Sequence, residues 1–380
     1  MSATVFDAIV LGTGGVGSAA LAQLARRGVR VLGLDRFPIA HDRGSSHGHT
    51  RMIRQAYMEH PDYVPLLRRA YALWDELEAL TERRLFWRVG LLEVGPADGF
   101  VVPGVIASAQ QHGLSVEQLS SDEVRRRFPG LEPGDTSAAV FEPDAGYLLV
   151  EDCVRAHLQV ACQHGATLET GQTVVNWSVG SQGVTVKTDR QTFHAARLVV
   201  AAGAWSAQLL GQLGCSLRVV RKHLHWFACR DPVYRQDRGC PAFLFEIDGV
   251  VYYGFPQIDD RGVKIAEHSD RGEPVADPLS LDRSPDDSER QRVRERLDRH
   301  LPGVSSTPTD HVVCMYTLSA DEHFIVDRHP EFPSLVFAAG LSGHGFKFAS
   351  TLGEALAEMA LDGCATQPLA FLSLKRFRDH

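Results

Sequence analysis

The first part of the chain, residues 1–35, shows the clearest pattern of apolar and polar segments. Residues 5–11 form a short apolar run that stops at a glycine, which predicts a buried strand because the run is too brief for a helix. Residues 18–27 have helix-forming composition with one apolar face, and Gly28 follows as the expected end of that helix. A second apolar run over residues 29–34 predicts another strand. Together these segments predict a βαβ unit.

The glycines of this unit have a spacing that suits a dinucleotide. Gly12 permits a tight turn, Gly14 lets the backbone approach a pyrophosphate, and Gly17 lets the helix pack closely on the strand. The start of the helix supplies unpaired N–H groups and a partial positive charge. Asp35 lies where a carboxylate accepts hydrogen bonds from ribose hydroxyls. The pattern predicts adenine dinucleotide binding; the alternative is a glycine-rich turn in an ordinary α/β protein.

Elsewhere, the pattern predicts further helices and strands. Helices are expected where apolar residues recur on one face, at residues 61–80, 102–112, 124–128, 151–164 and 350–361. Ser120 and Glu123 form a capping box before the third of these. Ser284 and Pro285 are expected to begin another helix that ends near His300. Strands are expected at residues 85–95, 174–179, 183–188, 192–194, 197–205, 223–229, 243–256 and 335–340.

This order of elements predicts an α/β chain with two domains. The nucleotide-binding domain is expected to be discontinuous, assembled from residues 1–90, 145–215 and 310–380. Residues 91–144 and 216–309 are expected to form the second domain, built from insertions into the first. A chain of 380 residues with 44% hydrophobic content can bury a core in each of two domains.

Composition and charge restrict the class of partner. A formal net charge of -8 offers no basic field for nucleic acid or an anionic membrane, so a small molecule is the expected partner. The sequence shows no basic leader and no apolar run near the ~18 residues of a membrane span, so a cytoplasmic location is expected. The 7 cysteines lack paired zinc or disulfide spacing and the 17 histidines lack a ligand pattern, so no metal is expected.

Five separated motifs give the chain a family resemblance. They are the unit from Gly12 to Asp35 and the segments at residues 44–51 (GSSHGHTR), 252–256 (YYGFP), 314–317 (CMYT) and 343–348 (GHGFKF). In this order they resemble the family of monomeric sarcosine oxidase and N-methyltryptophan oxidase over essentially the whole chain. The resemblance implies a Rossmann-like FAD-binding domain with an inserted mixed-sheet α+β substrate domain. It also implies a monomer that oxidises a secondary amino acid with O2.

The resemblance assigns roles to four charged or nucleophilic residues. Cys314 would be linked through sulfur to the flavin 8α carbon; the alternative is an inert buried cysteine. Arg54 and Lys347 would grip the substrate carboxylate, whereas an arginine before a helix is otherwise an ordinary surface charge. Lys264 would stabilise negative charge as O2 accepts electrons; its sequence context alone favours a surface lysine.

The resemblance also implies the neighbours of the flavin ring and the substrate. His47 and Arg51 would pack near the ring, Leu244 would vary with the substrate, and His268 would otherwise be a solvated loop histidine. A departure is His49, where the family commonly has aspartate. The implied catalytic residues are Lys264, Arg51, His268 and Tyr316. The implied substrate-binding residues are Arg54, Lys347, Tyr253, His344 and Leu244. The implied cofactor contacts are Gly12, Gly14, Gly17, Asp35, Arg36, His47, Thr50, Cys314, Gly343 and Gly345.

The predicted function is an FAD-linked oxidase of a secondary amino acid, N-methylated or cyclic and sarcosine-like. The substrate would become an imine that water hydrolyses to an aldehyde and an amino acid, and O2 would become hydrogen peroxide. No side chain is assigned as a strong general base, because the substrate can bind as the free amine. Two alternatives stay open: a flavin amine dehydrogenase with an acceptor other than O2, and a nucleotide-binding regulatory protein without turnover, since fold does not fix function.

Overall fold

The computed structural model describes residues 5–135, 137–211, 215–269 and 272–377. Its first sheet has the order β10-β11-β12-β1-β2-β9, with β19 beside β12 and β18 beside β19. The strands β1, β2, β9, β12 and β19 pair in parallel with one another, whereas β11 and β18 add antiparallel to β12 and β19. The strands of this sheet are β1 (Val5–Leu11), β2 (Val31–Leu34), β9 (Thr167–Glu169), β10 (Val174–Gly180), β11 (Gly183–Thr188), β12 (Thr192–Val200), β18 (Ile325–Arg328) and β19 (Leu335–Ala339).

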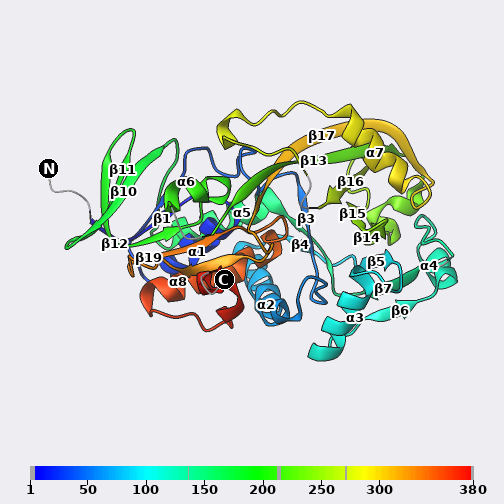
Figure 1. Cartoon of the computed structure of the whole chain (residues 1–380), viewed down its shortest axis with the longest axis horizontal. Helices are drawn as coiled ribbons and strands as arrows, with labels where there is room; N and C mark the ends of the chain where they lie inside the picture. The colour runs from blue at the N-terminus through cyan, green and yellow to red at the C-terminus, as the bar shows by residue number, and fades with distance from the viewer. Residues whose placement is uncertain (1–4, 136, 212–214, 270–271, 378–380) are drawn as a thin grey trace.

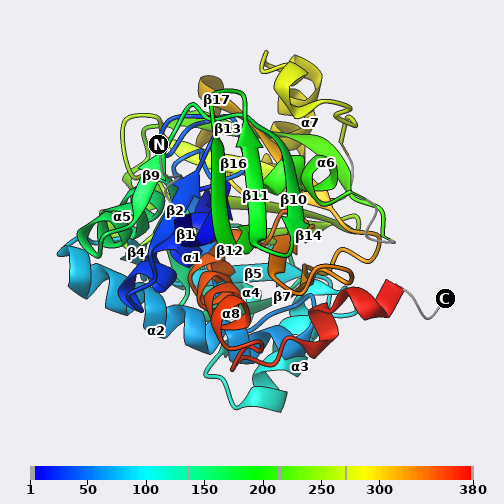
Figure 2. The same cartoon turned by 90° about the vertical axis from the view of Figure 1, so that its left-hand side faces the viewer.

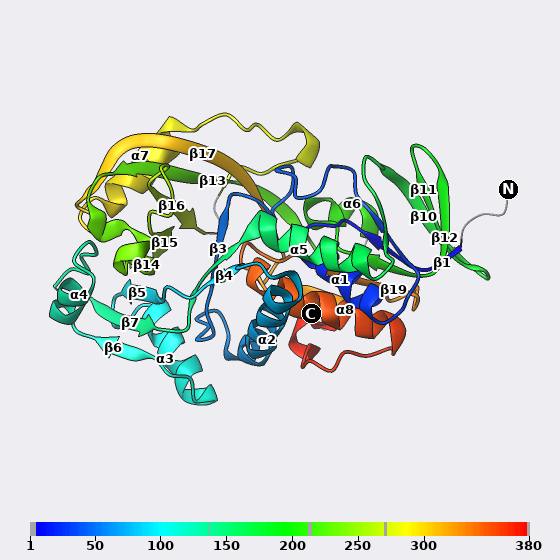
Figure 3. The same cartoon turned by 180° about the vertical axis from the view of Figure 1, so that it is seen from behind.

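Strand β1 lies in the middle of this sheet and supplies apolar side chains to both faces. Ala8 and Val10 belong to a core shared with the helices on one face, whereas Ile9 and Leu11 belong to the core on the other face. This alternation follows from the two-residue period of a strand. The helices on the first face lie together in Figure 3; they are α1 (Gly15–Arg26), α2 (Val64–Thr81), α5 (Val150–Gln163) and α8 (Ala349–Leu361).

A second sheet forms the other half of the molecule, with the order β17-β13-β16-β15-β14-β5-β7-β6. Its long pair, β13 and β17, runs across the top of Figure 1 from one half toward the other. The strands of this sheet are β5 (Leu91–Gly95), β6 (Glu117–Leu119), β7 (Ala138–Glu142), β13 (Arg218–Cys229), β14 (Ala242–Ile247), β15 (Val250–Phe255), β16 (Val263–His268) and β17 (Val304–Leu318). Its helices are α3 (Val101–His112), α4 (Ser121–Arg127) and α7 (Asp287–Leu297).

Short elements connect the two halves. A three-stranded sheet has the order β3-β8-β4, and a short helix, α6, follows β12. The remaining bounds are β3 (Thr50–Ile53), β4 (Phe86–Trp87), β8 (Gly146–Leu149), α6 (Ser206–Leu210), and the 3-10 helices η1 (Pro61–Tyr63), η2 (Gly203–Trp205), η3 (Pro232–Tyr234), η4 (Gln236–Arg238), η5 (Pro278–Ser280), η6 (Phe346–Phe348), η7 (Ala370–Leu372) and η8 (Leu374–Phe377).

The predicted βαβ unit is confirmed, with α1 beginning at Gly15 and β2 beginning at Val31. The predicted meander is also present as β10, β11 and the start of β12 (Figure 2). Its last strand does not stop at residue 194. Instead β12 continues to Val200 and pairs in parallel with β1, so one strand belongs to both the meander and the nucleotide-binding sheet.

Three predictions about individual elements are wrong. The expected strand at residues 243–256 is an antiparallel pair, β14 and β15, divided by a turn at Asp248 and Gly249. The expected helix from Pro285 to His300 is α7, which begins at Asp287 and ends at Leu297. Its cap is Asp286, whose carboxylate accepts the backbone N–H of Glu289, so Ser284 lies outside the helix. The expected strand at residues 85–95 is two strands, because β4 joins the three-stranded sheet and β5 joins the second large sheet.

The α/β fold class is confirmed, and the division into domains stays a prediction. Strand β17 remains paired with β13 as far as Leu318, beyond the boundary expected at residue 310. Among the described residues, no helix is both long enough and apolar enough to cross a membrane. The same residues contain no group of three His, Cys, Asp or Glu side chains arranged to hold a metal ion.

Candidate active site

The glycine turn between β1 and α1 opens the site. Gly12 has a φ of +83°, and a Cβ there would lie 2.6 Å from the Ala201 carbonyl oxygen. A Cβ on Gly17 would lie 1.7 Å from the Gly12 carbonyl oxygen. At Gly14 the nearest atom would be Ser46 Oγ at 3.4 Å, an ordinary contact. The fold therefore requires glycine at positions 12 and 17, whereas Gly14 is not needed for packing and can contact a ligand.

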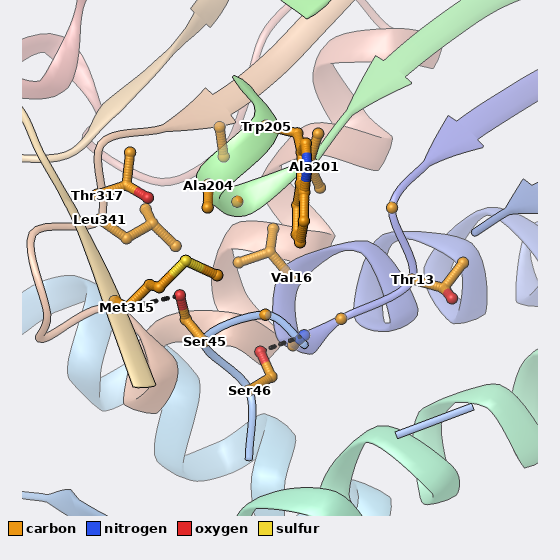
Figure 4. A pocket seen from close by; sticks show the side chains of 18 of the residues that line it. Thr13, Val16, Ser45, Ser46, Ala201, Ala204, Trp205, Met315, Thr317 and Leu341 are labelled. Carbon is orange, nitrogen blue, oxygen red and sulfur yellow. Dashed lines mark hydrogen bonds between the residues drawn. The ribbon is translucent and has the colours of Figure 1, made fainter. Parts of the chain in front are cut away.

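A deep cleft begins at this turn and encloses about 1540 Å³, including the open space at its mouth. In Figure 4, two serines join its walls: Ser45 Oγ donates to the Met315 carbonyl oxygen, and Ser46 Oγ accepts the Gly15 N–H. Trp205 and Ala201 lie on another wall. Most of the lining comes from five distant segments, namely residues 11–16, 34–51, 201–209, 314–317 and 338–349, and Val154, Gln172 and Val174 complete it.

Asp35 lies at the end of β2 and lines the cleft. Its Oδ2 accepts the Thr13 N–H at 2.7 Å and the Thr13 hydroxyl at 3.0 Å, while Oδ1 accepts the Phe37 N–H at 3.0 Å. Burial alone would raise the pKa of Asp35, but His41 and these N–H groups outweigh it and lower the pKa below the ordinary value. The carboxylate is thus held ionised beside the glycine turn, where it can accept further hydrogen bonds.

Cys314 lies on β17 and also lines the cleft. Arg51 Nη2 is 3.3 Å from its sulfur, and the same guanidinium donates to the Ser45 carbonyl oxygen at 3.0 Å. Burial opposes ionisation of the thiol, but Arg51 and His47 together lower the pKa of Cys314 to about 6. Since the thiolate is the reactive form of cysteine, this thiol is prepared for nucleophilic attack at neutral pH.

A smaller cavity of about 490 Å³ adjoins the cleft. The two spaces share four lining residues, Arg51, Tyr316, Gly343 and Phe346. The smaller cavity also contains every residue that the sequence assigned to the substrate. Those residues are Arg54, Leu244, Tyr253, His344 and Lys347. Because the walls are shared and Arg51 contacts the Cys314 sulfur, a ligand in the cavity would lie next to the part of the cleft that holds Cys314.

Arg54 is almost fully buried and already has acidic partners. Its Nη2 donates to both carboxylate oxygens of Glu59, at 3.0 and 2.9 Å, and its Nε lies 3.4 Å from Glu93 Oε1. Burial alone would raise the pKa of Glu59, but Arg54 foremost lowers it to about 2. A ligand carboxylate would therefore have to displace Glu59 from this arginine or share it.

Lys347 supplies the second positive group of the cavity. Its Nζ donates to the His344 carbonyl oxygen at 2.9 Å and to the Tyr57 hydroxyl at 3.4 Å. Burial and the nearby Arg54 lower the pKa of Lys347 to about 7. The His344 ring bridges the Tyr57 hydroxyl at 2.6 Å and the Glu322 carbonyl oxygen at 3.1 Å, and burial lowers its pKa to about 3. His344 is thus neutral, and Lys347 is the group that would form an ion pair with a bound anion.

Two aromatic residues and a histidine complete this cavity. His268 Nδ1 lies 3.3 Å from the Tyr316 hydroxyl oxygen, and its ring meets the Tyr253 ring edge-on at 6.5 Å between centroids. Burial lowers the pKa of His268 to about 4, so the imidazole is neutral. Burial also raises the pKa of both tyrosines, which therefore stay protonated and able to donate a hydrogen bond.

Lys264 is buried but lies outside the lining of both spaces. Its Nζ donates to the carbonyl oxygens of Gly48 and Thr50 at 2.7 and 2.9 Å and to the Thr50 hydroxyl at 3.1 Å. It also lies over the rings of Trp226 and Phe255, at 5.2 and 4.9 Å. Burial and Arg51 lower its pKa well below the usual value. The surface-lysine interpretation is therefore wrong.

His49, the departure from the family pattern, also lies outside both linings. It has a φ of +71°, and its N–H donates to the Glu151 carboxylate. Its ring nitrogen Nδ1 accepts from Arg261 Nη2 at 2.7 Å, and Arg261 is itself paired with Asp259. Burial and Arg261 lower the pKa of His49. The imidazole is thus a neutral hydrogen-bond acceptor. The carboxylate nearby belongs to Asp259, which is paired with Arg261, and not to residue 49.

The structure thus brings most of the predicted residues to two adjoining spaces. Gly17, His47, Thr50 and Lys264 do not line either space. The sequence analysis missed Glu59 and Glu93. Glu59 lies five residues after Arg54, so this short spacing could have suggested an ion pair. Glu93 is placed beside the cavity by the pairing of β5 with β14, and no sequence pattern predicts that pairing.

The cleft fits an FAD molecule on several observations. The first turn of α1 contains no acidic residue to compete for its positive end, and Gly14 there leaves room on the cleft side. An ionised Asp35 is bonded to this turn, and the reactive thiol of Cys314 lines the same cleft. These groups match, in order, the pyrophosphate, the ribose and the ring of a flavin dinucleotide.

The sequence matches the family described as FAD dependent oxidoreductase over residues 7–359. The chain belongs to this family. It is 41% identical to a monomeric sarcosine oxidase from Streptomyces avermitilis over 98% of this chain and 97% of that protein. It is 38% identical to an N-methyl-L-tryptophan oxidase from Yersinia pestis, over 98% and 100% of the two chains. The solved structure of NikD, described as an unusual amino acid oxidase, has a TM-score of 0.85 at 26% identity and 97% coverage of both chains.

Proposed function

We propose that this FAD-dependent oxidoreductase is an oxidase of a secondary amino acid, with a sarcosine-like substrate. The observation that carries the proposal is a buried cavity with two cationic side chains, Arg54 and Lys347, that shares its walls with the cofactor cleft. The family and the relatives named as sarcosine and N-methyltryptophan oxidases support it. Two neighbouring cationic groups suit one small carboxylate.

The residues of the cleft would hold FAD by its two ends. The glycine turn would bind the pyrophosphate and Asp35 the ribose, with Arg36 at the same edge. Gly343 and Gly345 would pass close to the ring end, where Cys314 lies. Bound FAD supplies the electron acceptor for amine oxidation and returns the electrons to O2 as hydrogen peroxide. Cys314 is proposed as the covalent attachment point, because Arg51 and His47 favour its thiolate.

The substrate would be fixed by its carboxylate. Arg54 and Lys347 would bind it while Tyr253, His268, Tyr316 and His344 enclose the amine and exclude water. Because His268 and His344 stay neutral, they do not repel an amine and neither needs to act as a strong base. The substrate carbon–nitrogen bond would become an imine, which water hydrolyses to an aldehyde and a primary amino acid.

Lys264 is proposed to act from behind the wall, on the reduction of O2. Its Nζ is held by the backbone oxygens of Gly48 and Thr50, next to Arg51, which lines both spaces. Because its pKa is lowered, this amine would take up a proton as negative charge develops on oxygen, and the resulting cation would stabilise that charge. The assignment rests on the family resemblance and on the burial of this lysine.

The partners follow from the same comparison. A small-molecule substrate and a monomeric state are proposed, since relatives of nearly full length carry the name monomeric sarcosine oxidase. Cytoplasmic location is proposed from the sequence alone. Leu244, which lines the cavity, is proposed to set the side-chain preference.

The test is anaerobic mixing of the flavin-loaded protein with sarcosine, N-methyltryptophan, pipecolate and proline. We expect bleaching of the flavin absorbance with at least one of them, sarcosine being fastest, and peroxide on admission of air. Bleaching without peroxide would favour a dehydrogenase. No bleaching with any member of the panel would overturn the proposed function.

A further inference from the structure

Glu93 is a buried carboxyl group that the proposed reaction does not use. It lies in the middle of β5, with Leu244 of β14 and Val140 of β7 as its neighbours across the sheet. Its exposed fraction is 0%, and neither carboxylate oxygen has a hydrogen-bond partner among the described residues. A carboxyl group is seldom buried this way without a role, because burying its ionised form is costly. Leu244, beside it on the sheet, lines the substrate cavity.

The ion pair of Glu93 is with Arg54. Glu93 Oε1 lies 3.4 Å from Arg54 Nε, while Glu59 occupies Nη2 of the same guanidinium. The remaining nitrogen, Nη1, has a weak contact at 3.8 Å with the sulfur of Met52. Two carboxyl groups therefore cover two sides of Arg54, and the charge that this arginine offers to a ligand depends on whether both are ionised.

The charged groups around Glu93 come from three segments, namely residues 54–60, β7 and η6. Arg54 and Lys347 are positive and would favour an ionised Glu93, whereas Glu142 and Glu59 are negative and oppose it. Glu142 is itself fixed by the N–H groups of Gln55 and Ala56 at 2.7 and 3.0 Å. Burial is the largest influence and raises the pKa of Glu93 to about 8. Near neutral pH, Glu93 is therefore mostly protonated beside an ionised Glu59.

We propose that Glu93 is a positioning residue for Arg54: when protonated it leaves the arginine's charge to the substrate carboxylate, and when ionised it competes for that charge. The inference rests on the proposed binding of a substrate carboxylate by Arg54. Beyond that binding, the inference assigns a role to the carboxyl group behind Arg54, whose protonation state would change the affinity for the substrate carboxylate. Binding of the substrate carboxylate would in turn keep the proton on Glu93, because two linked equilibria influence each other equally.

The expected consequence is a second step in the pH dependence of carboxylate binding. Lys347 loses its proton above about pH 7, which weakens binding of any carboxylate. In the wild type, ionisation of Glu93 weakens it further above about pH 8. In Glu93→Gln only the first step remains, so its affinity for a carboxylate should exceed that of the wild type by about tenfold near pH ~9.5 and match it within about twofold near pH ~6.5.

The test is a titration of the flavin-loaded protein with acetate, followed by flavin absorbance across this pH range, for the wild type, Glu93→Gln and Glu93→Leu. Acetamide, which has nearly the same shape without the charge, should show neither step. The matched control is Glu246→Gln, because Glu246 is a buried glutamate of the same sheet that binds the N–H groups of Phe100 and Val101. It should change thermal stability and leave the acetate profile as in the wild type.

Two further readouts separate this role from a merely structural one. The infrared carbonyl band of a protonated carboxyl group should disappear from the wild type as the pH rises through about 8 and be absent from Glu93→Gln. In turnover at about pH 9, Glu93→Gln should lower KM about tenfold with kcat nearly unchanged. Superimposable acetate profiles for the wild type and both Glu93 variants would overturn the inference alone. Failure of the wild type to bind acetate at any pH would overturn the carboxylate site as well.

Discussion

At the scale of single residues, the environment of Cys314 has the clearest chemical consequence. A buried thiol in apolar surroundings has a raised pKa, as Cys153 in α5 shows. Cys314 is equally buried, yet Arg51 at 3.3 Å and His47 bring its pKa to about 6. The difference between the two cysteines is therefore electrostatic, and it makes one of them a nucleophile at neutral pH.

We expect Cys314→Ser to bind FAD without a covalent bond. After acid denaturation the wild-type protein should stay yellow, whereas the variant should release all of its flavin to the supernatant. A serine hydroxyl is far less acidic than this thiol, so Arg51 cannot ionise it. Cys153→Ser is the matched control and should keep the flavin attached. Retention of flavin by denatured Cys314→Ser would show that the bond lies elsewhere.

The sequence could identify residues but not their partners. Arg54 and Lys347 were assigned to the cavity from the family resemblance, and both line it. Their electrostatic state depends on Glu59 and Glu93, which approach from a loop and from β5. The position of Glu93 beside Arg54 follows from the pairing of β5 with β14, and strand pairing between distant segments leaves no pattern in either strand alone.

At the scale of elements, the turn between β1 and α1 contains glycines that the fold requires and one, Gly14, that the fold does not require. Gly17→Ala would place its methyl carbon 1.7 Å from a backbone oxygen, so α1 would have to move away from β1. Gly14→Ala would meet nothing closer than a side-chain oxygen at 3.4 Å. Only a bound pyrophosphate would oppose that second methyl group.

We therefore expect opposite results from the two substitutions. Gly14→Ala should keep the stability of the flavin-free protein within about 0.5 kcal/mol while weakening FAD binding by tenfold or more. Gly17→Ala should destabilise even the flavin-free protein, by roughly 3 kcal/mol or more, because the clash is with backbone. Urea unfolding of the flavin-free proteins and titration with FAD measure the two effects. Equal loss of stability in both variants would contradict the distinction.

Elements with a strong local signal were predicted well, and elements defined by tertiary contacts were not. The capping box at Ser120 and Glu123 forms as expected, because both halves of it lie within four residues. The expected start of α7 at Pro285 is two residues too early, because Ser284 and Asp286 are both good helix caps. Only the hydrogen bond from the Glu289 N–H to the Asp286 carboxylate decides between them. The split between β4 and β5 depends on which sheet each strand joins.

At the scale of the whole molecule, the site exists only after distant segments meet. The covalent candidate on β17 lies beside Ser45 and Arg51, about 270 positions earlier in the chain, and the hydrogen bond from Ser45 to the Met315 carbonyl oxygen joins the two segments. The family resemblance predicted that these motifs act together. Periodicity could not, because it describes faces within an element and not the register between elements.

The stability of the whole molecule should fall as the pH is lowered from about 6.5 toward 4, because buried histidines are held neutral. Burial lowers the pKa of His157 to about 3 and that of His268 to about 4, below the ordinary value. Between the unfolded and folded pKa values the unfolded chain binds more protons, so each such histidine lowers the free energy of unfolding by up to about 1.4 kcal/mol per pH unit.

Urea unfolding at several pH values measures this dependence of the free energy of unfolding on pH. His157→Phe should make it shallower, because this ring lies against Trp74 and its Nδ1 has no partner among the described residues. The same substitution at the exposed His164 should leave the slope unchanged, and a wild-type stability that stays constant over this range would contradict the assignment of neutral buried histidines.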